Sequence, residues 1–288
     1  MDVSTLLAPI EGPAPSGVEL RHDDRFLAID RLLDPADKSA RLNPDGSING
    51  GAPQVSWQLV SDQGMALASE GRDLKLLVIL VRAGFALEGF GGLAQGLDML
   101  TQTLAQYWDS LHPALRERPD AKAASLPRAN ALKDLENDDN GLLGDLRFGF
   151  PLVVRGIGPI SGDDLASAVL SDFAMLNRAA SGLSQAEKDA LVAAHGQRVS
   201  RVSAASRGFA AEQPVEAAAM IAGLEACTAG VQALERAFEA ATGLPEGQAL
   251  VLPELRGFLD NAAATLCAGR DAVGGTGLAA PEPETGSG

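Results

Sequence analysis

The chain has 288 residues, and its 23 Lys and Arg against 38 Asp and Glu give a formal net charge of −15 at pH 7. A charge of this size repels nucleic-acid phosphates and anionic lipid surfaces, so the composition argues against nucleic acid and membrane as ligands. The length and an apolar share of 46% suffice for two domains with separate cores.

Cysteine spacing and the apolar segments indicate a cytoplasmic protein. Cys227 and Cys267 lack the spacing of metal ligands and fall at apolar positions of helical patterns, which favours buried free thiols over a disulfide. The longest aliphatic run, residues 76–81, is far shorter than the ~20 apolar residues that cross a bilayer. Asp2 and the lack of a positive region at the N-terminus argue against a cleaved signal. We therefore expect no membrane insertion.

The N-terminal fifty residues have little regular pattern. Prolines and glycines crowd residues 1–22, which predicts an extended strap without regular helix. A short amphipathic helix is then expected from about Asp23, with Phe26 and Ile29 on its buried side. Residues 35–53 have no periodicity and predict a mobile surface loop.

The next segment predicts three helices. The first begins near Trp57, and the second runs from about Arg72 to Glu88 and is apolar almost all round, which is typical of the centre of a bundle. The pair Gly91 and Gly92 is expected to separate it from the third, which Pro113 bounds. The buried stripe of that third helix is predicted from apolar residues at three- and four-residue steps: Leu93, Leu97, Leu100, Leu104, Tyr107 or Trp108, and Leu111.

A break in the helical pattern marks a domain boundary near residue 150. Glycines and prolines interrupt residues 149–160, around the apolar run 152–154 that is suited to a short strand. The predicted fold class is all-α, with two bundles of antiparallel helices and this one short β segment. In chain order the predicted parts are the strap 1–22, a helical domain 23–148 with the loop 35–53, a connector 149–160, a second bundle 161–268 and a disordered tail 269–288.

Capping signals locate the helices of the second bundle. Ser184 and Glu187 form a capping box for a helix that is expected to end near His195. A long helix is predicted over residues 214–242, and the last one over residues 253–268.

The chain shows few patterns that suggest enzymatic chemistry. The dyad His22-Asp23 is found in helical metal-dependent phosphohydrolases, but that site needs a further His upstream. The acidic segment 136–141 lacks the Glu that closes an EF-hand loop, so a solvated helix end is the better interpretation. The glycine-rich segment 89–94 lies between helices and not after a strand, so it does not predict a phosphate site. We predict no catalytic, cofactor or metal residue, and no cofactor.

The charged residues Asp73, Asp109 and Arg128 lie within apolar helical patterns. We expect Arg128 to bond one of the two carboxylates, since buried charges usually pair. The alternative is three separately solvated charges. Gly92 and Gly96 leave a smooth strip one turn long, which suits either tight packing within the domain or a groove for a partner.

The run from Leu87 to Pro113 resembles a motif of the N-terminal domain of the ImpA/TssA family, a cytoplasmic component of the bacterial type VI secretion system. Shorter stretches near residues 6–20, 57, 73–75 and 128–132 resemble the same family, so the resemblance spans about residues 1–135. The motif residues, for which a structural role is the better interpretation, are Pro9, Gly17, Leu20, Trp57, Asp73, Leu74, Glu88, Gly89, Phe90, Gly92, Leu93, Gly96, Tyr107, Trp108, Asp109, His112, Pro113, Arg128 and Asn130.

The resemblance implies a non-enzymatic assembly protein that binds baseplate, tail-tube or sheath proteins of the secretion machine. It leaves open which surface binds and whether the chain self-associates. In the family a C-terminal domain builds rings, and we expect no ring from these residues, which are either a shortened piece or a short family member. The alternative function is a helical metal-dependent hydrolase or a small-ligand-binding domain that uses clustered acids.

Overall fold

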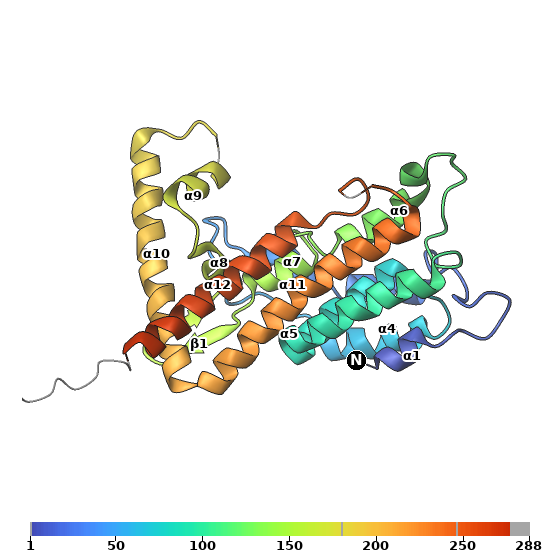
Figure 1. The fold of residues 1–288 in the computed structure, drawn as a ribbon, viewed down its shortest axis with the longest axis horizontal. Coiled ribbons are helices and arrows are strands. Elements are labelled where there is room, and N and C mark those ends of the chain that lie inside the picture. The colour runs from blue at the N-terminus through green and yellow to red at the C-terminus, as the bar shows by residue number, and fades with distance from the viewer. Residues whose placement is uncertain (1, 180, 246, 277–288) are drawn as a thin grey trace, which may run out of the picture. The chain divides into compact units, whose positions relative to one another are not determined.

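The computed structural model describes residues 2–179, 181–245 and 247–276. Among these residues the regular secondary structure is almost wholly helical (Figure 1). Within these residues the only sheet is an antiparallel hairpin of β1 (Leu152–Val154) and β2 (Gly158–Ile160), in which Leu152 faces Ile160. The predicted all-α class with one short β segment is confirmed. The predicted tail lies, from residue 277 on, outside the described residues.

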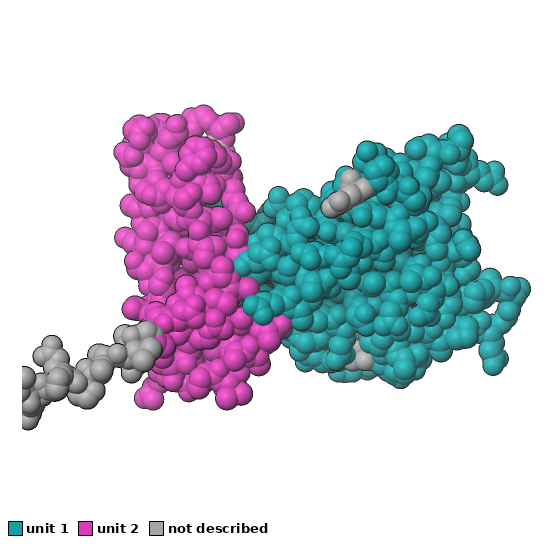
Figure 2. Space-filling view, viewed as in Figure 1, with its two compact units in different colours: residues 1–149, 223–260 teal, residues 150–222, 261–288 magenta. Residues whose placement is uncertain are grey.

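The chain divides into two compact units, which Figure 2 shows in different colours. Unit 1 comprises residues 1–149 and 223–260, and unit 2 comprises residues 150–222 and 261–288. The predicted second bundle, residues 161–268, therefore corresponds to neither unit. The difference arises because two long helices, α11 (Pro214–Thr242) and α12 (Pro253–Thr276), each contribute residues to both units.

The N-terminal segment is more regular than the sequence predicts. Helix α1 (Val3–Leu7) lies within the predicted strap, and Asp2 caps it by accepting a hydrogen bond from Thr5 N at 3.2 Å. The prediction of a strap without helix was wrong here because the prolines begin only at Pro9, which leaves room for one helical turn before them. Helix α2 (Asp24–Arg31) begins where it was expected.

Local structure also occurs within the predicted loop 35–53. A 3-10 turn, η1 (Asp34–Ala36), is followed by helix α3 (Lys38–Arg41). Residues far away in the sequence fix the position of this segment. Lys38 N donates to Asp139 O at 2.7 Å, and Asn140 Nδ2 donates to Asp37 Oδ1 at 2.7 Å. Contacts of such large sequence separation are invisible to periodicity, which explains why the segment looked unstructured.

Helix α5 (Leu74–Tyr107) forms the core of unit 1, together with α4 (Trp57–Ala68), α6 (Ala121–Lys133) and α7 (Leu142–Phe148). All residues of its first part up to Gly84 are buried except Lys75, as predicted for the centre of a bundle. At Gly89 the backbone leaves the helical region with φ 66° and ψ −150°, a conformation that glycine adopts most readily. The break thus lies at Gly89, before the predicted pair Gly91 and Gly92.

The half of α5 before the break at Gly89 packs against the half after it. A Cβ at Gly92 would lie 2.2 Å from Gly84 O, and a Cβ at Gly96 would lie 2.9 Å from Val81 Cγ2. Gly92 and Gly96 are therefore needed for close packing within the domain, and the alternative of an open docking strip is wrong.

Two helices, α5 and α11, are long and apolar enough by length and composition to cross a membrane. In α5, 67% of the most apolar window is buried inside the fold, whereas in α11 the share is 33%. The break at Gly89 divides α5 into two helices that are each shorter than the ~20 residues of a membrane span. The hydropathy of α5 is thus explained by its place in the core.

Unit 2 contains the hairpin and the helices α8 (Gly162–Ser167), α9 (Asp172–Arg178) and α10 (Gln185–Glu212). Ser184 and Glu187 form the predicted capping box of α10. That helix runs past its predicted end near His195, and α12 likewise runs past residue 268. Gly196 lies within α10 and Gly269 within α12, and neither glycine ends its helix.

Candidate functional site

Three buried arginines of unit 1 each lie over an aromatic ring of the sequence motif. Arg72 lies 3.8 Å from the ring centroid of Tyr107, Arg128 4.6 Å from that of Trp108, and Arg82 5.5 Å from that of Trp57. None of the three arginines is more than 3% exposed. Four motif residues, Trp57, Tyr107, Trp108 and Arg128, therefore take part in cation–π pairs inside the domain.

Arg128 binds backbone carbonyls, not the predicted carboxylates. Its guanidinium donates to Pro113 O at 2.8 Å and also to Trp108 O and Leu111 O. These carbonyls lie at and just beyond the end of α5, where helical partners are missing, so a cation satisfies them. Burial lowers the pKa of Arg128 to about 10, against the opposing effect of the nearby Asp109.

Neither of the two carboxylates proposed as partners of Arg128 forms a hydrogen bond or ion pair with it within the described residues. Asp73 is 5% exposed and caps α5 by accepting a hydrogen bond from Lys75 N at 2.8 Å, whereas Asp109 is exposed. The predicted pairing was therefore wrong, and so was the alternative of three solvated charges. Helical spacing indicates that a charge is buried, but not whether its partner is a side chain or the backbone.

Arg72 and Tyr107 attach the N-terminal segment to α5. Arg72 donates to Leu6 O at 2.9 Å, to Ala8 O at 2.6 Å and to Pro15 O at 2.7 Å. The hydroxyl of Tyr107 donates to Leu7 O at 2.6 Å. These four bonds give the proline-rich segment a defined path, which its own sequence does not dictate.

A third arginine site was missed by the sequence analysis. Arg82 Nε donates to Asp145 Oδ2 at 2.7 Å, Arg82 Nη1 donates to Asn140 O at 3.1 Å, and Arg41 also pairs with Asp145. The signal was present, because Arg82 interrupts the apolar segment of the central helix. A buried pair of this kind is destabilising unless both partners stay hydrogen-bonded, which is the case here.

The motif residues differ in burial. Leu20, Asp73, Leu74, Gly92, Leu93, Gly96, Tyr107 and Arg128 are buried; Gly17, Trp57, Phe90, Trp108, His112 and Pro113 are half-buried; Pro9, Glu88, Gly89, Asp109 and Asn130 are exposed. A Cβ at Gly17 would lie 2.1 Å from Glu70 O, and its φ is +64°, so two constraints require glycine there.

Three motif residues line a groove on unit 1. Asp73, Pro113 and Asn130 meet Phe26 and Asp134 around a cavity of about 500 Å³. Burial raises the pKa of the Asp73 carboxyl and of the Asp134 carboxyl. This groove is the part of unit 1 in which motif residues, apolar surface and perturbed carboxyls occur together.

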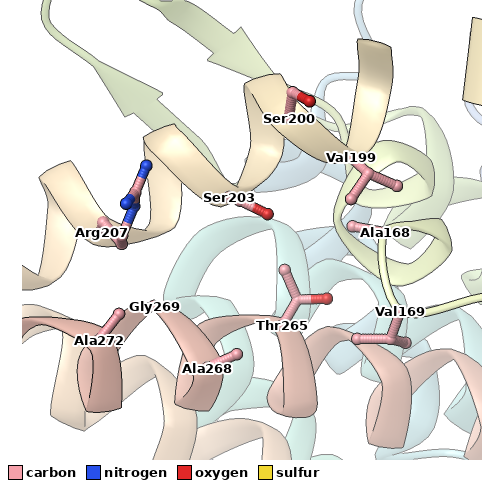
Figure 3. Close-up of a pocket in the computed structure, with 10 residues that line it drawn as sticks. All are labelled: Ala168, Val169, Val199, Ser200, Ser203, Arg207, Thr265, Ala268, Gly269 and Ala272. Carbon is pink, nitrogen blue, oxygen red and sulfur yellow. The ribbon is translucent and has the colours of Figure 1, made fainter. Parts of the chain in front are cut away.

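A second groove lies in unit 2 between α10 and α12, with a volume of about 560 Å³. Figure 3 shows small side chains along both helices, among them Ser203 and Thr265. Gly269 lets the helices approach, since a Cβ there would lie 2.6 Å from Ser206 Cβ. Arg207 is the only charged residue among those that line it, so the groove lacks a pair of groups for acid–base chemistry.

The residues considered for metal or acid–base chemistry are dispersed or neutralised. In the part of the chain that the structure describes, no three His, Cys, Asp or Glu residues are placed to hold a metal ion. In the acidic segment, Asp138 accepts from Lys38 and from Arg147, each at 3.0 Å, and Glu136 accepts from Lys133 at 2.8 Å.

The two cysteines are free thiols, and they differ in burial. Cys227 is buried, and its Sγ donates to Phe90 O at 3.3 Å. Burial raises the pKa of its thiol to about 12, which suppresses the reactive thiolate. Cys267 is half-buried, so the prediction of a buried thiol holds only for Cys227.

Comparison with known proteins gives three findings. Residues 7–137 match the family described as ImpA, N-terminal, type VI secretion system. Over 162 residues, or 56% of this chain, the sequence is 31% identical to the type VI secretion system component TssA1 of Pseudomonas aeruginosa, and the match covers 44% of that protein. In fold the chain is similar to the N-terminal domain, including the ImpA_N region, of the TssA component from Burkholderia cenocepacia, with a TM-score of 0.63, 19% identity and 95% coverage of both chains.

The family match, residues 7–137, contains all the motif residues. The match to the relative from Pseudomonas aeruginosa spans less than half of that protein, and the likeness to the solved structure shows the fold alone. Residues 7–137 thus carry the ImpA N-terminal domain of type VI secretion proteins, and the matched relative is itself a TssA component.

Proposed function

We propose that the chain is a non-enzymatic assembly component of a type VI secretion system, which acts in the cytoplasm and binds baseplate, tail-tube or sheath proteins. The match of residues 7–137 to the ImpA N-terminal domain and the similarity to a TssA1 component support a role in the secretion machine. The use of most motif residues in packing and backbone capping supports a scaffold role over a catalytic one.

The single observation that carries this proposal is the arginine network of unit 1. Arg72, Arg82 and Arg128 are the most chemically distinctive buried groups of the domain, and each is used to hold backbone or a carboxylate in place. None of the three lines either of the two grooves described above. Here they stabilise a rigid helical body that is suited to present surfaces to other proteins.

The test is direct binding to purified components. The 288-residue chain, immobilised through a tag, is incubated separately with baseplate, tail-tube and sheath proteins of the same secretion system. We expect saturable binding of at least one of these proteins. Absence of binding to all of them at micromolar concentration would contradict the proposal.

The alternative of a metal-dependent hydrolase is tested by thermal denaturation with Mg²⁺, Mn²⁺ or Zn²⁺. A ligand that binds only the folded state raises the melting temperature. We expect no saturable increase with any of the three ions. An increase that saturates with one ion would favour the alternative and would justify assays for hydrolysis.

A further inference from the structure

The groove of unit 1 combines an apolar wall with acidic groups, of which Asp73 is buried and Asp134 half-buried. Phe26 and Leu27 of α2 and Pro127 and Ala131 of α6 supply apolar surface, and Leu27 is 42% exposed although it is a large apolar residue. Exposed apolar surface beside a concavity is typical of a site that another molecule covers.

Four carboxylates line the groove, namely Glu19, Asp30, Asp73 and Asp134. Glu19 is exposed and Asp30 pairs with Lys75, whereas Asp73 and Asp134 lie at opposite kinds of helix terminus. Asp73 is the N-cap of α5, where a negative charge is favourable. Asp134 is the C-cap of α6, where the helix dipole favours a cation and disfavours a carboxylate. Within the described residues, neither forms an ion pair with a lysine, arginine or histidine. Burial raises the pKa of Asp134 more than the nearby Lys75 and Arg82 and the side-chain hydrogen bond with Asn137 lower it, so these groups only partly offset the cost of its position.

The cations around the groove are already engaged or exposed. Lys75 Nζ pairs with Asp30 Oδ1 at 3.4 Å and lies 5.9 Å from the ring centroid of Phe26. Arg21 and Arg116 also line the groove, and both are exposed to water. The buried charge of the groove is therefore negative, and the complementary ligand is a cation with an apolar neighbour.

We propose that this groove docks a segment of a partner protein that inserts an arginine or lysine side chain toward Asp73 and Asp134 and rests an adjacent apolar side chain on Phe26 and Leu27. A side-chain cation suits the site better than a metal ion, because the described residues offer no cluster of three metal-ligating side chains here. The inference rests on the proposed function only in that a secretion-system protein would supply the segment.

The experiment uses a short probe and the 288-residue chain. The peptide N-acetyl-leucyl-arginyl-leucinamide is titrated into isotope-labelled protein, and backbone and side-chain amide shifts are followed by NMR. We expect saturable shifts at Asp73, Lys75, Asn130 and Asp134. The same peptide with neutral citrulline in place of arginine should bind about tenfold more weakly, since it lacks the charge.

Two substitutions locate the site. Asp134→Asn keeps the shape of the side chain and removes its charge, and it should weaken binding of the arginine peptide about tenfold. Asp139→Asn makes the same change at an exposed position outside the groove and should leave binding unchanged. Equal binding of both peptides, equal binding by the Asp134→Asn protein, or no saturable shifts at the groove would each overturn the inference.

The outcome is separable from that of the proposed function. If the Asp134→Asn protein still binds its secretion-system partner with unchanged affinity, the groove is not the docking site, while the role in the machine stands. If the peptide binds at the groove but no secretion-system protein binds the chain, the proposed function fails and the cation site remains.

Discussion

At the scale of single residues, buried arginines donate hydrogen bonds to backbone carbonyls that have no backbone donor as partner. Arg128 satisfies three carbonyls around the end of α5, and Arg72 satisfies three carbonyls of the N-terminal segment. A planar guanidinium with five donors can do this, whereas a lysine ammonium cannot match the same geometry.

Replacement of Arg128 by Ala should lower the free energy of unfolding by about 3 kcal/mol, because buried carbonyls would lose their donors. Thermal or urea denaturation measures this change. The control is Arg25→Ala, whose side chain is 57% exposed and whose ion pairs are at the surface, so it should cost much less stability than Arg128→Ala. Equal stability of the Arg128→Ala protein and its parent would contradict the role given to this side chain.

Asp134 gives a prediction for pH. Burial raises the pKa of its carboxyl above the ordinary value of 3.8, so ionised Asp134 destabilises the folded state at neutral pH. Asp134→Asn should therefore raise the free energy of unfolding at pH 7 by about 0.5 kcal/mol, the usual effect of a charge at a helix end. The advantage should shrink as pH falls toward the ordinary carboxyl pKa, where the parent side chain is protonated in both states. Asp139→Asn, at an exposed position, should show no such trend.

At the scale of elements, α5 shows how glycines of one segment perform different tasks. Gly89 breaks the helix with a positive φ, Gly92 lets Gly84 O approach, and Gly91 has no atom within 4 Å of an added Cβ. From the sequence, Gly91 and Gly92 are predicted together to separate two helices. Their different roles depend on three-dimensional neighbours that the local sequence does not reveal.

Alanine substitutions separate these tasks. Gly92→Ala should destabilise unit 1 by about 2 kcal/mol or more, since its Cβ would lie 2.2 Å from Gly84 O. Gly91→Ala is the matched control in the same turn, and it should stabilise the helix by up to about 1 kcal/mol. Denaturation midpoints of the two variants measure the difference. A Gly91→Ala protein as unstable as Gly92→Ala would refute this assignment.

At the scale of the whole molecule, net charge and helix hydropathy make opposite predictions about membranes. The formal charge of −15 disfavours anionic lipid, whereas α5 and α11 are apolar enough to be considered as spans. In α5 the apolar residues are largely buried in the fold, so they are not available to lipid.

The chain should therefore not sediment with vesicles of phosphatidylcholine and phosphatidylserine, at low or at high salt. Repulsion by the net charge is strongest at low salt, and burial of the apolar residues of α5 holds at both salt concentrations. Binding that persists at high salt would show that the apolar surface of a helix reaches the lipid. Neutral phosphatidylcholine vesicles serve as the control for this hydrophobic contribution.

The sequence alone determined the all-α class, the central position of the helix that begins at Leu74, the cap at Ser184 and the ImpA N-terminal domain, because each depends on local periodicity or on a linear motif. The tertiary structure alone decided that Arg128 binds carbonyls, that residues 223–260 join unit 1 and that Asp73 and Asp134 share a groove. The physical reason is that periodicity reports which side of a helix is buried. The atoms that meet that side come from residues far away in the chain.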